Sequence, residues 1–98
     1  DHVLLVDTQT VQPVRGMHGQ TTGHILDHHP ATRDLPPGWT LVTEDVGAAT
    51  TFLVEKLSER GLVLSPTEAT LLTLGIYEDT GGLSYETTTP RDLRSAAW

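Results

Sequence analysis

The sequence contains no cysteine and no long apolar run. The absence of cysteine excludes a disulfide scaffold and any thiolate metal site, and makes the reducing cytoplasm the expected location. No segment approaches the roughly 20 apolar residues that span a bilayer, which excludes a membrane protein. The first residues form a short apolar run between acidic residues, so no secretory signal peptide is recognisable.

Basic residues are also scarce. Six Lys and Arg stand against thirteen Asp and Glu, which gives a formal net charge of −7. Nucleic-acid binders place clusters of basic side chains along the phosphate backbone, and this chain has no such surplus. If the ligand is a polyanion, something other than the side chains must supply the positive charge.

The length of 98 residues and mass of 10.6 kDa correspond to one domain or part of one. The chain begins without Met, directly before a strand-like run, and ends with Trp98 in an apolar helical pattern. Natural domains usually begin and end in exposed polar segments. We therefore expect residues 1–98 to be one partial domain, an excerpt of a larger protein.

Three short strands are predicted in the first half of the chain. Residues 3–6 form a continuous apolar run, which is typical of a parallel strand buried on both faces. Residues 24–27 form a second short strand that ends before Pro30. Residues 39–43 alternate between apolar and polar side chains and form the third.

The second half predicts helices. Residues 46–60 place apolar side chains on one stripe. Residues 65–68 combine three helix start signals, glycines at 81–82 end that helix, and residues 89–92 repeat the start signal. Strands followed by and mixed with helices predict the α/β class, with a mainly parallel sheet flanked by helices.

Acidic and imidazole side chains follow the first two strands. Asp7 comes directly after the first strand, and Asp27, His28 and His29 come at the end of the second. Open α/β sheets bind ligands at their carboxyl edge, where strand ends converge. If the strands are parallel, these four side chains therefore meet at one edge of the sheet.

Asp79 is a further candidate, near the end of the second predicted helix. A carboxylate there meets the negative end of the helix dipole, at a cost of about 0.3–1 kcal/mol that a bound cation would reverse. Carboxylates and imidazoles without thiolates suit Mn²⁺, Mg²⁺, Fe²⁺ or Zn²⁺. Because successive residues of an extended segment point to opposite faces, we expect one of His28 and His29 to bind metal and the other to face substrate or to pack.

Taken singly, these residues have ordinary interpretations as turn formers, caps or surface side chains, but three motifs in combination are more specific. They are Val-Asp-Thr at 6–8, Ile-Leu-Asp-His-His-Pro at 25–30 and Gly-Ile-Tyr-Glu-Asp-Thr-Gly-Gly-Leu at 75–83. In this order they resemble the DHH phosphoesterase superfamily over nearly the whole chain. Residues 87–98 are most similar to DHH domains of multidomain bacterial proteins with CBS modules and a tRNA-nucleotidyltransferase-like region. The nanoRNase/pAp-phosphatase and exopolyphosphatase branches come next.

The resemblance implies the Rossmann-like part of a DHH N-terminal domain and a two-metal phosphohydrolase, usually dependent on Mn²⁺, with Mg²⁺ or Co²⁺ as alternatives. It implies that Asp7 bridges both ions and that His28 and Asp79 are further metal ligands. His29 would contact the scissile phosphate, and Asp27 would orient its neighbours. The substrate would be a phosphoester or phosphoanhydride of a nucleotide, a short RNA or polyphosphate, cleaved by the two-metal hydroxide mechanism.

The sequence departs from the family in one motif. A His-x-x-x-Asp-x-Asp before Asp7 is absent from these residues, as is the family's second, substrate-gripping domain. We therefore expect the 98 residues to be inactive alone, to have downstream domains of the parent chain as partners, and to leave apolar surface through which a homo-oligomer could form. Two other hypotheses stay open: a non-catalytic module that binds nucleotide or docks on other domains, and a structural single-metal site of His28 and His29.

Overall fold

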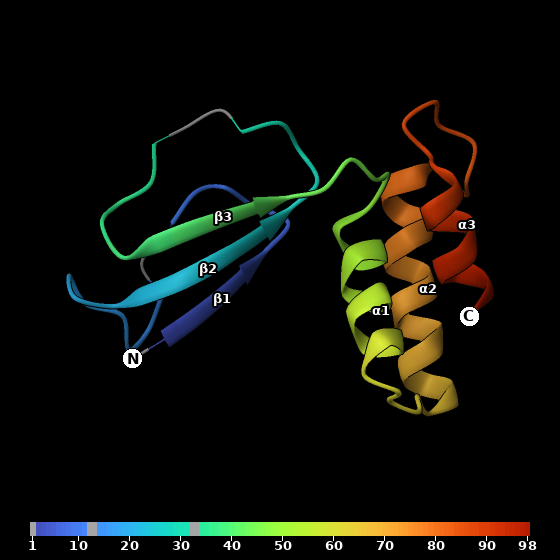
Figure 1. Ribbon diagram of the computed structural model, residues 1–98, viewed down its shortest axis with the longest axis horizontal. Helices are drawn as coiled ribbons and strands as arrows, with labels where there is room; N and C mark the ends of the chain where they lie inside the picture. The colour runs from blue at the N-terminus through green and yellow to red at the C-terminus, as the bar shows by residue number, and fades with distance from the viewer. Residues whose placement is uncertain (1, 12–13, 32–33) are drawn as a thin grey trace. The chain divides into compact units, whose positions relative to one another are not determined.

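The computed structural model describes residues 2–11, 14–31 and 34–98, which fold into two compact units (Figure 1). In residues 1–45 the strands are β1 (His2–Val6), β2 (Thr22–Asp27) and β3 (Trp39–Thr43). In residues 46–98 the helices are α1 (Ala49–Glu59), α2 (Pro66–Thr80) and α3 (Pro90–Ala97). Within the described residues, no helix is long and apolar enough to cross a bilayer.

The three strands form one parallel sheet in the order β1-β2-β3. Val6 of β1 pairs with Leu26 of β2, and Asp27 of β2 pairs with Thr43 of β3. All three strands therefore end at the same edge. The predicted α/β class and the parallel direction of the strands are confirmed.

The sheet has one covered and one open face. Ile25 is fully buried, and on the same face a Cβ at Gly23 would lie 2.3 Å from the carbonyl oxygen of Val3 and 2.7 Å from the Trp39 ring. Glycine is thus what lets Trp39 pack against β2. The prediction that residues 3–6 are buried on both faces is wrong, because β1 alternates and leaves Leu4 and Val6 exposed on the other face. These exposed side chains agree with the uncovered apolar surface expected from the sequence.

Capping residues set the bounds of α2 and α3. Ser65 and Glu68 form a capping box at the start of α2, and Gly81 ends that helix in the left-handed conformation, with φ of 58°. Thr89 and Asp92 form a second capping box at the start of α3. These predicted starts are confirmed. Helix α1 is shorter than the predicted 46–60, because Ala48 is still extended.

Asp92 joins α3 to the start of α1. Its side chain is fully buried and accepts hydrogen bonds from the Gly47 backbone N–H at 2.8 Å, the Thr51 hydroxyl at 2.5 Å and the Thr89 backbone N–H at 2.7 Å. Burial opposes ionisation of this carboxyl, but these hydrogen bonds outweigh burial and lower the pKa of Asp92 below its usual 3.8. Asp92 is therefore a carboxylate that links the start of α3 to the start of α1.

Asp92→Asn keeps the shape of the side chain but turns an N–H₂ group toward donors. We expect it to lower the free energy of unfolding by about 2–4 kcal/mol. Because the pKa of Asp92 is lower in the folded than in the unfolded state, its stabilisation is complete above the unfolded value of 3.8 and is lost as pH falls through the folded value. The difference between wild type and variant should therefore shrink below about pH 4.

Urea unfolding followed by circular dichroism, repeated between about pH 3 and 7, measures both effects. Asp34→Asn, at an exposed carboxylate, is the control and should change stability little. Equal losses in the two variants would contradict the role given to Asp92.

Candidate metal centre

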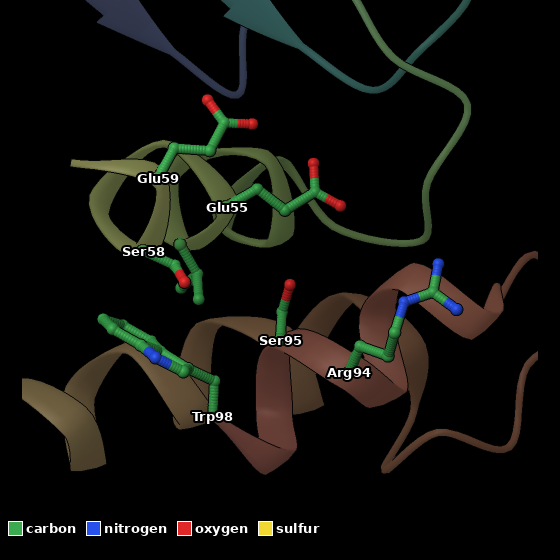
Figure 2. Close-up of a pocket in the computed structure, with 7 residues that line it drawn as sticks. Glu55, Ser58, Glu59, Arg94, Ser95 and Trp98 are labelled. Atoms are coloured by element: carbon green, nitrogen blue, oxygen red, sulfur yellow. The ribbon is translucent and has the colours of Figure 1, made fainter. Parts of the chain in front are cut away.

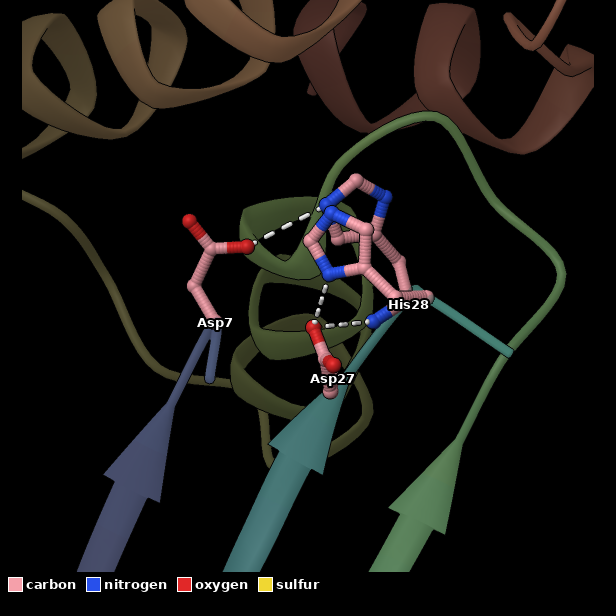
Figure 3. Close-up of side chains that lie close together, drawn as sticks. Asp7, Asp27 and His28 are labelled. Atoms are coloured by element: carbon pink, nitrogen blue, oxygen red, sulfur yellow. Dashed lines mark hydrogen bonds and ion pairs between the residues drawn. The ribbon is translucent and has the colours of Figure 1, made fainter. Parts of the chain in front are cut away.

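Asp7 leaves the end of β1 in an unusual backbone conformation. Its φ is 64°, in the left-handed region, which costs most residues about 1 kcal/mol or more but which Asp tolerates better than most. Its backbone N–H donates to the Leu26 carbonyl at 2.9 Å, which extends the pairing of β1 with β2 by one residue. Figure 3 shows its carboxylate directed toward His28, whose Nε2 lies 3.1 Å from Asp7 Oδ1.

Asp27 ends β2 and is 4% exposed. Its Oδ1 accepts a hydrogen bond from the His28 backbone N–H at 2.9 Å and lies 2.8 Å from His29 Nδ1, while Oδ2 accepts from Gln9 Nε2 at 2.9 Å. Burial opposes ionisation, but the hydrogen bonds from Gln9, His29 and the His28 backbone outweigh it and lower the pKa of Asp27. Asp27 is thus an ionised carboxylate that fixes the start of the following turn.

His28 and His29 lie side by side. Their ring centroids are 4.1 Å apart, with an angle of 45° between the rings. The prediction that they point to opposite faces is wrong, because β2 ends at Asp27 and the chain bends at both histidines. They still differ in environment: the His28 side chain is 13% exposed and pairs with Asp7, whereas that of His29 is 59% exposed and pairs with Asp27.

The four side chains form a cluster of metal-ligand type. One ligand atom from each of Asp7, Asp27, His28 and His29 lies within 4.8 Å of all the others. Ligands on opposite sides of one ion lie about 4 Å apart when each bond is about 2.0–2.2 Å, so small side-chain rotations bring this set around an ion. The predicted convergence at one sheet edge is confirmed. Asp79 lies in the last turn of α2, in the other unit, and its part in the centre stays a prediction.

Gln9 is a residue of this edge that the sequence did not reveal. It lies in the segment after β1, and its side-chain amide contacts Asp27 and the backbone of the turn that follows. Its position two residues after Asp7 is the one sequence signal that could have marked it. Glutamine was not among the candidates because carboxylates and imidazoles were the metal ligands expected there.

A pocket of about 460 Å³ lies in the helical unit (Figure 2). Its polar lining includes Glu55, Ser58, Glu59, Arg94 and Ser95, next to Trp98. Arg91 donates two hydrogen bonds to Glu55, at 2.8 and 2.5 Å, and lowers the pKa of that carboxyl. Lys56 donates to Glu59 at 2.9 Å. Since its carboxylates are already paired with cations, this pocket is a weaker candidate than the cluster at the sheet edge.

Comparisons with known proteins give three curated relatives, and no family model matches the chain. The A-adding tRNA nucleotidyltransferase of Aquifex aeolicus is 49% identical over 98 residues, covering 98% of this chain and 11% of the relative. The enzyme of the same name from Geobacter sulfurreducens is 47% identical over 76 residues, covering 76% and 8%. The bifunctional oligoribonuclease and PAP phosphatase NrnA of Mycoplasma genitalium is 36% identical over 72 residues, covering 74% and 23%.

The fold has a counterpart among solved structures. A Methanococcus jannaschii structure assigned to the family II inorganic pyrophosphatases matches 98% of this chain with a TM-score of 0.74, at 23% identity and over 34% of its own length. The predicted resemblance to the DHH superfamily is confirmed. The predicted similarity to proteins with a tRNA-nucleotidyltransferase region is also confirmed. The chain spans about a tenth of the two nucleotidyltransferases and less than a quarter of NrnA.

The left-handed backbone of Asp7 predicts an unusual order of variant stabilities. At most positions Ala is favoured over Gly, but at φ of 64° we expect Asp7→Gly to be more stable than Asp7→Ala by about 1 kcal/mol. The matched pair Thr8→Gly and Thr8→Ala should show the ordinary order, since Thr8 has no positive φ. Chemical denaturation of the four variants measures both differences, and Ala more stable than Gly at both positions would rule out the strain at Asp7.

Proposed function

We propose that this chain is the metal-binding part of a DHH-type phosphohydrolase domain that cleaves a phosphoester or phosphoanhydride. The observation that carries the proposal is the set of two carboxylates and two imidazoles within 4.8 Å at the carboxyl edge of a parallel sheet. The donor set fits a divalent ion such as Mn²⁺, with Mg²⁺ or Co²⁺ as alternatives. When bound, such an ion would neutralise negative charge on the phosphate and lower the pKa of a coordinated water.

The side chains divide into holding and substrate-facing groups. Asp7 and His28 would hold an ion, because His28 Nε2 and Asp7 Oδ1 already face each other at 3.1 Å. Asp79 would join them from α2. Since a carboxylate can only accept, His29 donates from Nδ1 to Asp27. That leaves the Nε2 of an exposed ring, which in the imidazolium form can donate to a phosphate oxygen.

The substrate class rests on the relatives. One is named as an oligoribonuclease and PAP phosphatase and the structural neighbour as a pyrophosphatase, so their names cover phosphoesters and phosphoanhydrides. We extend this to a nucleotide, a short RNA or polyphosphate as the substrate of a longer protein that contains the chain. Other domains of that protein would be the partners, and the cysteine-free sequence supports the cytoplasm as the compartment.

A second candidate function is a non-catalytic module that binds nucleotide or docks on a neighbouring domain. It is favoured by the two relatives at 47% and 49% identity, whose names describe A-addition to tRNA rather than hydrolysis. Activity measurements on a longer protein that carries a His-x-x-x-Asp-x-Asp motif separate the two functions.

The first prediction from this proposal concerns metal binding. We expect the chain to bind Mn²⁺ weakly at one site, because Asp7 and His28 leave most of the six donor positions to water. Asp7→Asn tolerates the left-handed backbone but removes the charge, and should raise the Kd for Mn²⁺ by more than about tenfold, as should His28→Ala. Electron paramagnetic resonance of free Mn²⁺ measures the Kd. Asp34→Asn removes the same charge elsewhere and should leave it unchanged.

The second prediction concerns turnover. The 98 residues should hydrolyse phosphoesters negligibly even with Mn²⁺, because a single weakly held ion cannot clamp both attacking and leaving oxygens. A longer protein with an intact His-x-x-x-Asp-x-Asp should release phosphate or nucleotide. There Asp7→Asn, His28→Ala and Asp79→Asn should each abolish release while circular dichroism stays unchanged. Robust Mn²⁺-dependent turnover by the chain alone would overturn the ligand count.

A further inference from the structure

The side-chain amide of Gln9 contacts three acceptors at once. Its Nε2 donates to Asp27 Oδ2 at 2.9 Å, to the His29 carbonyl at 3.1 Å and to the Pro30 carbonyl at 2.9 Å. None of these oxygens can donate, so the N–H₂ end of the amide must be the end that faces them. Two hydrogens serve three acceptors, which means that one of them is shared.

These contacts link the segment after β1 to the end of β2 and to the turn beyond it. With Oδ2 of Asp27 engaged by Gln9, Oδ1 is turned toward the His28 backbone N–H and His29 Nδ1. The two carbonyl contacts hold the backbone of residues 29 and 30, where the chain has left the sheet and no strand is assigned. Gln9 thus contacts Asp27, which lies against the His29 ring, and the backbone of the turn that carries both imidazoles.

We propose that Gln9 is a positioning residue of the metal centre. It fixes Asp27 and the turn 28–30, so that His28 is in place to hold an ion and His29 to face a phosphate before an ion arrives. Groups that orient ligands in this way commonly change metal affinity by about 10–100-fold when removed. The proposal rests on the proposed function in one respect, that this cluster binds a divalent ion.

Two substitutions at position 9 distinguish the hydrogen-bonding role of the amide from the length of the side chain. Gln9→Met has nearly the same length without a donor, and Gln9→Asn keeps the amide on a side chain one carbon shorter. Gln20→Met and Gln20→Asn make the same changes at an exposed glutamine that precedes β2, at the end of that strand away from Asp27. Urea unfolding establishes conditions in which every variant is folded, so that later losses report on the site and not on stability.

The first measurement is made without metal. Nitrogen-15 spectra of the His28 and His29 rings, at one fixed pH, report whether His29 Nδ1 still donates to Asp27. We expect both Gln9 variants to shift and broaden the His29 ring signals and both Gln20 variants to leave them unchanged. Unaltered His29 signals in Gln9→Met would overturn the positioning role.

The second measurement is the Kd for Mn²⁺ by electron paramagnetic resonance. We expect Gln9→Met and Gln9→Asn to raise it about 10–100-fold and the Gln20 variants to leave it within about twofold of wild type. An unchanged Kd in both Gln9 variants, with the expected loss in Asp7→Asn, would overturn the proposal and leave the proposed function standing. No Mn²⁺ binding by wild type would instead refute the proposed function, and the ring signals would still decide whether Gln9 holds the turn.

Discussion

The parallel pairing of β1 with β2 is the constraint on which the candidate metal centre depends. With Val6 opposite Leu26, the residues that follow each of them, Asp7 and Asp27, leave the sheet at the same edge. If the six-residue β2 ran in the opposite direction, Asp27 would lie at the far end of the strand. At about 3.3 Å per residue, it would then be about 17–20 Å from Asp7. A shift by one residue would turn Asp27 to the open face, away from its donors. The four side chains can therefore converge at this edge only when β2 has both this direction and this register relative to β1.

The same edge holds two features that cost the fold free energy. Asp7 occupies the left-handed region, and Asp27 is a carboxylate removed from water. Such features persist where the surroundings over-determine them, and here Gln9, the His28 backbone and His29 all donate to Asp27. For stability alone, Gly at position 7 and an apolar residue at position 27 would be favoured. The carboxylates of Asp7 and Asp27 are the groups that give this edge the capacity to bind a cation.

Local signals in the sequence predicted most of the elements and the convergence of the acidic and imidazole residues. The helix starts are set by residues within four positions of one another, and strand direction follows from the continuous apolar runs. What the sequence could not predict depends on distant contacts. Asp92 is recognisable as a cap of α3, but its bond to Gly47, 45 residues away, is not. The close approach of the His28 and His29 rings depends on a bend of the chain after β2. The contacts of Gln9 depend on the same bend, because it brings the His29 and Pro30 carbonyl groups to the Gln9 amide.

Electrostatics set the conditions under which this edge can meet a phosphate. The chain carries a formal net charge of −7, and Arg91 and Lys56 are engaged by Glu55 and Glu59 in the helical unit. Like charges 4 Å apart repel by about 4 kcal/mol at an effective dielectric constant of 20, so a phosphate next to the carboxylates of Asp7 and Asp27 is strongly disfavoured. A divalent ion held by Asp7 and His28 would offset the charge of the two carboxylates, and a second ion would make the edge positive. If the chain binds phosphate as proposed, ions held by its carboxylates must supply the positive charge, so the placement of the carboxylates matters more than that of any basic side chain.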